Sequence, residues 1–68
     1  MAIPITKKQK QILDFLETYY DKYGFMPTYL EMSNIFKLSK ATIWEHLYNL
    51  EKAGRIKMYH KARGIEIT

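Results

Sequence analysis

The sequence predicts a mostly α-helical domain that ends in a small β-hairpin. Apolar residues first recur at the three- and four-residue spacing of amphipathic helices, and after Gly54 they alternate with polar residues as in β-strands. Three stretches begin with a Ser or Thr that can cap a helix, and a glycine follows two of them. The 68 residues leave room for a single domain with a small core.

Composition excludes several classes of protein. The hydrophobic and charged fractions, 47% and 26%, are typical of an ordinary globular domain. The chain has no cysteine, so it offers no disulfide and no thiolate metal site, and no apolar run is long enough for a signal peptide or a membrane span. We therefore expect a cytoplasmic protein with no metal, no cofactor and no membrane partner. The 11 Lys and Arg residues against 7 acidic residues favour an anionic partner.

The first predicted helix covers residues 7–23. Thr6 and Gln9 have the spacing of a capping box, in which each side chain bonds the backbone amide of the other residue. Gly24 can end the helix in the left-handed conformation. The apolar stripe and its aromatic edge are predicted to contain Ile12, Leu13, Leu16, Tyr19, Tyr20 and Tyr23.

A second, shorter helix is predicted over residues 29–36. Before it, the connector GFMPT combines a helix stop, a proline and a new cap, and residues 25–26 are a candidate for a very short strand. Thr28 and Glu31 repeat the capping-box spacing. Only residues 37–39 separate this helix from the next one, and a link this short is typical of a helix-turn-helix.

The third predicted helix, residues 40–53, has two contrasting faces. Ser39 can cap its start, and Gly54 can end it. Ile43, Leu47 and Leu50 share one stripe, which we expect to be buried. At about 100° per residue, the opposite side carries Ala41, Glu45, Tyr48 and Lys52, with Lys40 and Trp44 on one flank and Thr42 and Asn49 on the other.

A wing-like hairpin is predicted over residues 55–67. Ile56, Met58, Ile65 and Ile67 alternate with polar residues, so each strand should have one buried side. The tip is strongly cationic. Three helices followed by such a hairpin make up a winged helix-turn-helix.

The helix and the hairpin together favour double-stranded DNA as the partner. An α-helix fits the major groove, where side chains near its N-terminus meet base edges, and a cationic hairpin beside it can reach phosphates. Lys40 could donate to guanine, Thr42 could offer its methyl to thymine, and Glu45 could accept from the cytosine amino group. We expect base reading by Ser39, Lys40, Thr42, Trp44 and Glu45. We expect DNA-backbone contacts from Thr28, Tyr29, Tyr48, Asn49, Lys52, Lys57, His60, Lys61 and Arg63.

Other interpretations stay open. The charged side of the third helix could simply be solvated. Trp44 and Tyr48 could instead anchor a protein partner, which would make the domain a protein–protein interaction module. A third possibility is nucleic-acid binding without sequence preference. An enzyme is not expected, because WEHL lacks the second histidine of a zinc-protease motif and no nucleotide-binding glycine loop occurs.

Four short motifs occur in order along the chain. They are T-x-x-Q-x-x-I-L-D from Thr6, G-x-x-P-T-x-x-E-M from Gly24, E-H-L-x-x-L-x-x-x-G from Glu45, and R-G-I-x-I from Arg63. With these motifs the chain resembles the N-terminal DNA-binding domain of LexA-type repressors. The resemblance covers nearly the whole chain and implies a repressor-like transcriptional regulator, with two copies on the half-sites of one duplex. Because the family's dimerisation domain is not matched, we expect a monomer or a weak homodimer.

The third helix departs from the family pattern at two positions. Where the family often has Asn and a second Glu, this chain has Ala41 and Trp44. Ala41 lacks an amide that can bond adenine, and Trp44 offers an indole N–H and a large apolar surface. We therefore expect a target sequence that differs from the family's usual operator. Ser39 and Lys40 are adjacent, which does not match the Ser/Lys dyad of the family's peptidase domain.

Overall fold

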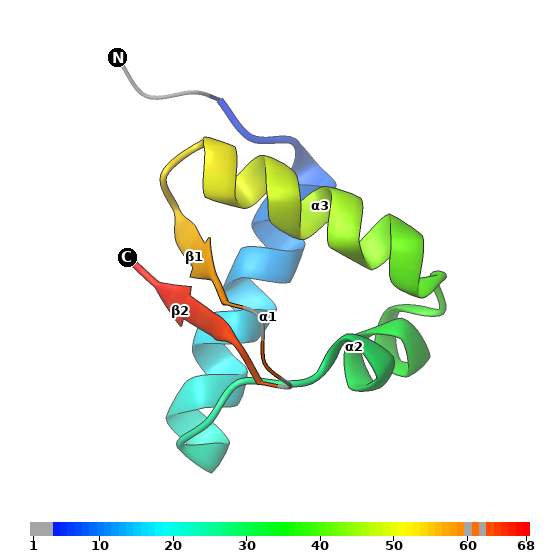
Figure 1. The fold of residues 1–68 in the computed structure, drawn as a ribbon, viewed down its shortest axis with the longest axis vertical. Coiled ribbons are helices and arrows are strands. Elements are labelled where there is room, and N and C mark those ends of the chain that lie inside the picture. The colour runs from blue at the N-terminus through cyan, green and yellow to red at the C-terminus, as the bar shows by residue number, and fades with distance from the viewer. Residues whose placement is uncertain (1–3, 60, 62) are drawn as a thin grey trace.

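The computed structural model describes residues 4–59, 61 and 63–68. Three helices precede a two-stranded antiparallel sheet, in the order α1 (Lys7–Tyr23), α2 (Tyr29–Phe36), α3 (Lys40–Lys52), β1 (Ile56–Met58) and β2 (Ile65–Ile67). Figure 1 shows α3 crossing in front of α1, with the hairpin on one side and α2 on the other. The predicted fold class, three helices and a wing, is confirmed. No helix in the described part of the chain is long and apolar enough to span a bilayer.

Each helix begins where its cap residue predicts. Thr6 Oγ1 accepts from the Gln9 amide and Gln9 Oε1 accepts from the Thr6 amide, both at 3.1 Å. In the same way, Thr28 Oγ1 accepts from the Glu31 amide at 3.1 Å and Glu31 Oε1 accepts from the Thr28 amide at 2.8 Å. Ser39 Oγ accepts from the Thr42 amide at 3.1 Å. Both predicted capping boxes are present, and they fix the starts of α1 and α2.

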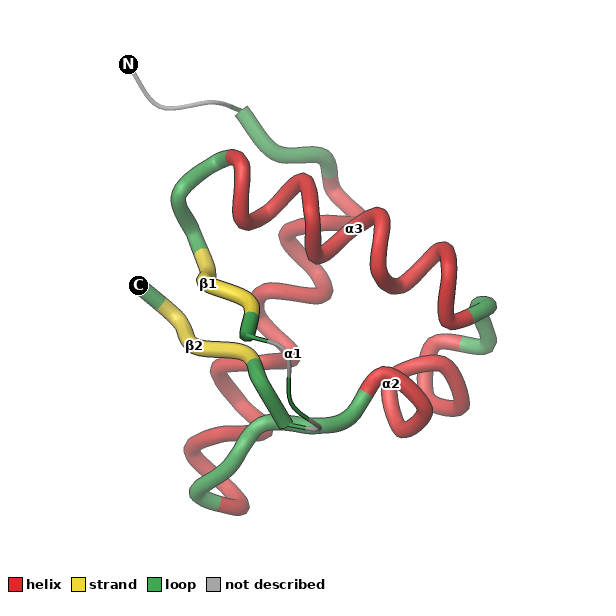
Figure 2. Tube along the Cα trace, in the orientation of Figure 1, coloured by secondary structure: helices red, strands yellow, loops and turns green. Residues whose placement is uncertain are grey.

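A left-handed residue follows each helix within two positions, and one of these residues is unexpected. Gly24 and Gly54 have φ values of 79° and 76°, as predicted for residues that end helices. α3 ends at Lys52, one residue before the expected 53, because Ala53 caps it. Lys37 follows α2 with a φ of 56°, a value that residues with a side chain adopt rarely. Figure 2 shows the short connection between α2 and α3 in green, and residues 37–39, which form it, include no glycine.

The core lies where the three helices meet the inner side of the hairpin. The stripe of α3 is fully buried, and Ile56 and Ile65 of the hairpin are 1% and 7% exposed. Met58 and Ile67, also predicted on the buried side, are only partly buried. The other large buried side chains include Ile12, Leu13 and Leu16 of α1, Met26 and Pro27 of the connector and Met32 of α2.

Two aromatic residues predicted at the edge of the core lie largely outside it. Tyr20 and Tyr23 are 51% and 49% exposed. The reason is visible in Figure 1, where the last turns of α1 extend away from α3. The helical period places these rings on the side of α1 that carries the stripe, but β2 and Phe25 cover that end only in part.

The hairpin has a single register, and its turn requires a glycine. Ile56 pairs with Ile67, Lys57 with Glu66, and Met58 with Ile65. Gly64 is buried, and a Cβ at this position would collide with the carbonyl oxygens of residues 59 and 61. The sheet therefore depends on glycine for close backbone approach.

The short strand predicted at residues 25–26 is wrong. These residues have no strand conformation, and the carbonyl of Met26 accepts a hydrogen bond from the side chain of Arg63 at 3.0 Å. The hydrogen-bond partner of this carbonyl is therefore a guanidinium and not the backbone of a neighbouring strand.

Candidate nucleic-acid interface

The outward side of α3 carries an ordered row of aromatic and cationic side chains. Trp44 and Tyr48 are 44% and 41% exposed, and their rings stack with a centroid distance of 5.0 Å and an interplanar angle of 14°. Lys52 continues the row, with Nζ 5.3 Å from the centre of the Tyr48 ring. These residues follow one another at four-residue spacing, which places them on one line along the helix. The buried stripe on the opposite side fixes the direction in which the row points.

The start of α3 uses two of the predicted base-reading residues for its own capping. Ser39 Oγ accepts from the Thr42 amide and also lies 2.9 Å from the Thr42 hydroxyl. The two hydroxyls therefore bind each other, although each keeps further hydrogen-bonding capacity, and Thr42 also presents a methyl group. Lys40 and Glu45 are exposed, and within the described residues neither forms an ion pair.

A hollow separates α3 from the wing, as we call the β1–β2 hairpin. Aromatic rings from three elements meet there, since Tyr29 comes from α2, Trp44 and Tyr48 come from α3, and Tyr59 follows β1. Tyr59 was not among the predicted site residues. The strand alternation in RIKMY could have identified it, because it places Tyr59 on the same outward side as Lys57.

Glu51, a further residue of this hollow, connects α3 to the wing. Its Oε2 accepts from the Met58 amide at 2.8 Å, so a carboxylate near the expected DNA side binds a backbone donor. Tyr29 lies close enough to be affected, since burial and then the negative charge of Glu51 raise the pKa of its phenol above the ordinary value. A tyrosine hydroxyl is already neutral at physiological pH, and this shift keeps the Tyr29 hydroxyl a donor.

The side chain of Arg63 forms hydrogen bonds with other residues of the domain. Its Nη1 donates to Glu31 Oε1 at 2.7 Å and its Nη2 lies 3.4 Å from Oε2, while the guanidinium sits 4.6 Å from the centre of the Phe25 ring. The Thr28 amide and then Arg63 hold the pKa of Glu31 below its ordinary value. Arg63 thus uses three of its five N–H donors on Glu31 and the Met26 carbonyl, and it connects the wing to the start of α2. The phosphate contact expected of Arg63 stays a prediction.

Most of the remaining predicted backbone contacts lie around two hollows of the surface. Lys61 lies with Thr28 and Tyr29 around a shallow hollow, so the tip of the wing and the start of α2 border the same surface. Asn49 and Lys52 line a different hollow near the start of α1. Lys57 is exposed opposite Glu66 in the sheet, and His60 lies outside the described residues.

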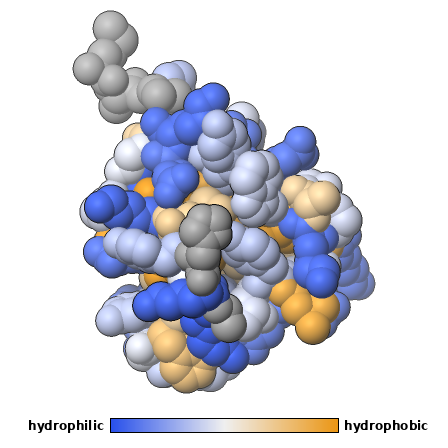
Figure 3. All heavy atoms as spheres, in the orientation of Figure 1, coloured by the Kyte–Doolittle hydropathy of each residue, from blue (hydrophilic) through white to orange (hydrophobic). Residues whose placement is uncertain are grey.

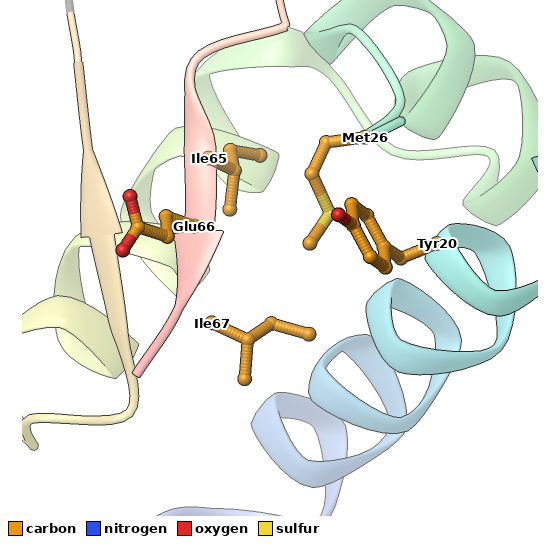
Figure 4. A pocket seen from close by; sticks show the side chains of 5 residues that line it. All are labelled: Tyr20, Met26, Ile65, Glu66 and Ile67. Atoms are coloured by element: carbon orange, nitrogen blue, oxygen red, sulfur yellow. The ribbon is translucent and has the colours of Figure 1, made fainter. Parts of the chain in front are cut away.

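Apolar features of the surface lie apart from this row. In Figure 4, Ile65 and Ile67 point from β2 toward Tyr20 and Met26, whereas Glu66 points to the other side of the strand. Figure 3 shows hydrophilic spheres over most of the view and a hydrophobic group over α2. Among the residues with described positions, no group of three His, Cys, Asp or Glu side chains is arranged to hold a metal ion.

Comparison with known proteins identifies similar domains. Residues 2–64 match the family of the LexA DNA binding domain. The LexA repressor of Koribacter versatilis is 36% identical over 67 residues, which is 96% of this chain and 32% of the relative. The LexA repressor of Petrotoga mobilis is 38% identical over 93% of this chain and 31% of its own length, and that of Cereibacter sphaeroides is 40% identical over 94% and 29%. The chain thus spans about a third of the length of these relatives.

Proposed function

The chain belongs to the LexA DNA-binding domain family, and from this premise we propose that it binds double-stranded DNA as a sequence-specific, repressor-like regulator of transcription. The observation that carries the proposal is the outward row of α3, whose side chains project beside a cationic wing. An α-helix fits the width of the major groove. Because one side of α3 is fixed in the core, its other side is free to face the base edges.

The start of α3 supplies the proposed base contacts. Lys40 donates to guanine or a nearby phosphate, and Glu45 accepts from the amino group of cytosine. Both side chains are exposed in the first two turns, where a recognition helix meets base edges. Ser39 supports this end of the helix through its cap.

The wing and the start of α2 supply the proposed contacts to phosphates. Lys57 and Lys61 are exposed cations on the wing, and Tyr29 adds a neutral hydroxyl donor at α2. Arg63 and Glu51 hold the wing in place for these contacts. In this scheme Arg63 positions the wing, and it is the neighbouring lysines that neutralise phosphates.

A salt titration of duplex binding tests the proposal. The logarithm of the affinity should fall steeply and linearly with the logarithm of salt concentration, because each neutralised phosphate releases counterions. Lys61→Ala should reduce the slope by about 1. The matched control is Lys22→Ala at the far end of α1, which should leave the slope unchanged. A flat salt response, or no binding to any duplex at low salt, would contradict the proposal.

Selection from random duplex DNA tests sequence specificity. We expect a consensus, and a palindromic one would support two copies on adjacent half-sites. Binding without any consensus would support the alternative of nonspecific nucleic-acid binding.

The exposed Trp44 and Tyr48 rings favour a second candidate, a protein–protein interaction module, since such rings often anchor interfaces. This candidate predicts that Trp44→Ala abolishes capture of a protein partner and leaves duplex binding unchanged.

A further inference from the structure

We propose that Trp44, backed by Tyr48, recognises the 5-methyl group of thymine in the major groove. This inference rests on the proposed function and deepens it, because it assigns the class of base that α3 selects. It arises from the combination of side chains at the start of the helix and from the stacking of the two rings.

The start of α3 presents few hydrogen-bonding groups to a base. Ala41 is exposed and offers only a methyl group, and the hydroxyls of Ser39 and Thr42 lie 2.9 Å apart and bind each other. Lys40 and Glu45 are the polar exceptions. Trp44, 44% exposed, therefore provides the main apolar contact surface in this part of the helix.

The indole is held before any DNA arrives. It stacks on Tyr48 at 5.0 Å and 14°, and Lys52 packs over the next ring in the row. Such packing restricts the rotation of both rings, so little side-chain entropy is lost when Trp44 contacts a base. The fully buried Ile43 and Leu47 hold the helix turn from which it projects.

The chemistry of the indole selects thymine over the other bases. Thymine presents a methyl group beside the O4 acceptor in the major groove, whereas cytosine and adenine present amino donors. Indole has an apolar ring and a single N–H donor and no acceptor, so it can cover the methyl and donate to O4. It cannot accept from an amino group. Its N–H could also donate to the N7 or O6 acceptors of the purines, so the methyl group is the feature that distinguishes thymine.

This inference is tested in a duplex that carries the consensus found by selection from random DNA. Single thymines of this duplex are replaced by uracil, because the replacement removes only the methyl group. For the wild-type protein, at least one dT→dU change should weaken binding about fourfold, as expected for one buried methyl group. Trp44→Ala should bind the dT and dU duplexes equally well. Trp44→Phe, which keeps an apolar ring, should retain part of the difference. Fluorescence anisotropy titrations give the dissociation constants.

Two variants serve as controls. Tyr20→Ala removes another exposed ring, 51% exposed, from the α1 side of the molecule and should keep the full response to uracil. Lys40→Ala should weaken both duplexes and preserve their ratio. Circular dichroism confirms that each variant is folded.

The outcomes separate this inference from the proposed function. Wild-type binding that is insensitive to every uracil, or an equal uracil effect in Trp44→Ala, overturns thymine recognition by Trp44 while DNA binding stands. Failure to bind any duplex overturns both.

Discussion

α3 and the wing both carry exposed cations and aromatic rings, but hydrogen bonds contribute more to holding the wing than to holding α3. Three fully buried side chains, Ile43, Leu47 and Leu50, hold α3 against the rest of the core. The wing has two strands of three residues each, and polar contacts from Arg63 and Glu51 supplement its few buried residues. Hydrophobic burial thus fixes the orientation of the helix, whereas the position of the wing depends both on the burial of Ile56 and Ile65 and on hydrogen bonds from Arg63 and Glu51. Substitutions in the two regions should therefore differ in how much they lower the free energy of unfolding.

The largest effect is expected in the stripe of α3. Leu47→Ala should lower the free energy of unfolding by about 2–5 kcal/mol, because it leaves a cavity in a small core. Urea denaturation measures the change. Glu45→Ala on the opposite side is the control and should stay within about 0.5 kcal/mol of wild type. Similar losses from both substitutions would mean that burial does not hold this helix.

A smaller loss of unfolding free energy is expected for a substitution in the turn of the wing. Gly64→Ala should cost about 1–3 kcal/mol, because the added Cβ collides with backbone carbonyls that cannot move aside freely. Thermal unfolding gives the loss, and amide chemical shifts should change mainly in residues 55–67. Gly24→Ala places a side chain at positive φ in open space, so it should destabilise α1 and leave the shifts of the wing unchanged. Unchanged wing shifts in Gly64→Ala would contradict the structure of this turn.

The contact between Arg63 and Glu31 should matter more for the position of the wing than for stability. Arg63→Ala should lower the stability only slightly, because an exposed ion pair is screened by solvent. It should weaken DNA binding without changing the salt slope, whereas Lys61→Ala should lower the slope and leave stability unchanged. A lower slope in Arg63→Ala would show that this guanidinium contacts phosphate after all.

The smallest effect is a pH dependence at Glu31. Binding by the Thr28 amide and by Arg63 holds its pKa below the ordinary glutamate value of about 4.3. The resulting stabilisation is complete above that value and is lost as the pH falls through the lower pKa of the folded state. Glu31→Gln keeps a capping oxygen without the charge, so its Tm should lie below that of wild type at pH 7, and the difference should shrink below about pH 4.

The capping box of α1 provides the control, because Gln9 does not titrate. The Tm difference between wild type and Gln9→Ala should therefore stay constant over the same pH range. A constant difference for Glu31→Gln as well would mean that the charge of Glu31 contributes nothing to the fold.

Local patterns were sufficient to predict the helices and the two sides of α3. The pairs Thr6–Gln9 and Thr28–Glu31 form hydrogen bonds across three residues, a distance that the helical backbone itself sets. Burial of the α3 stripe followed in the same way from its spacing. Such features involve neighbours along the chain, and their geometry does not depend on the rest of the fold.

The roles of the charged residues depend instead on contacts between distant segments. Arg63, predicted to bind phosphate, lies 32 positions from Glu31 in the sequence, and only the packing of the wing against α2 brings the two together. The pairing of Glu51 with the Met58 amide likewise requires β1 to lie beside α3. Sequence spacing fixes which side of an element a residue occupies. Which partner meets that residue depends on how the core packs one element against another.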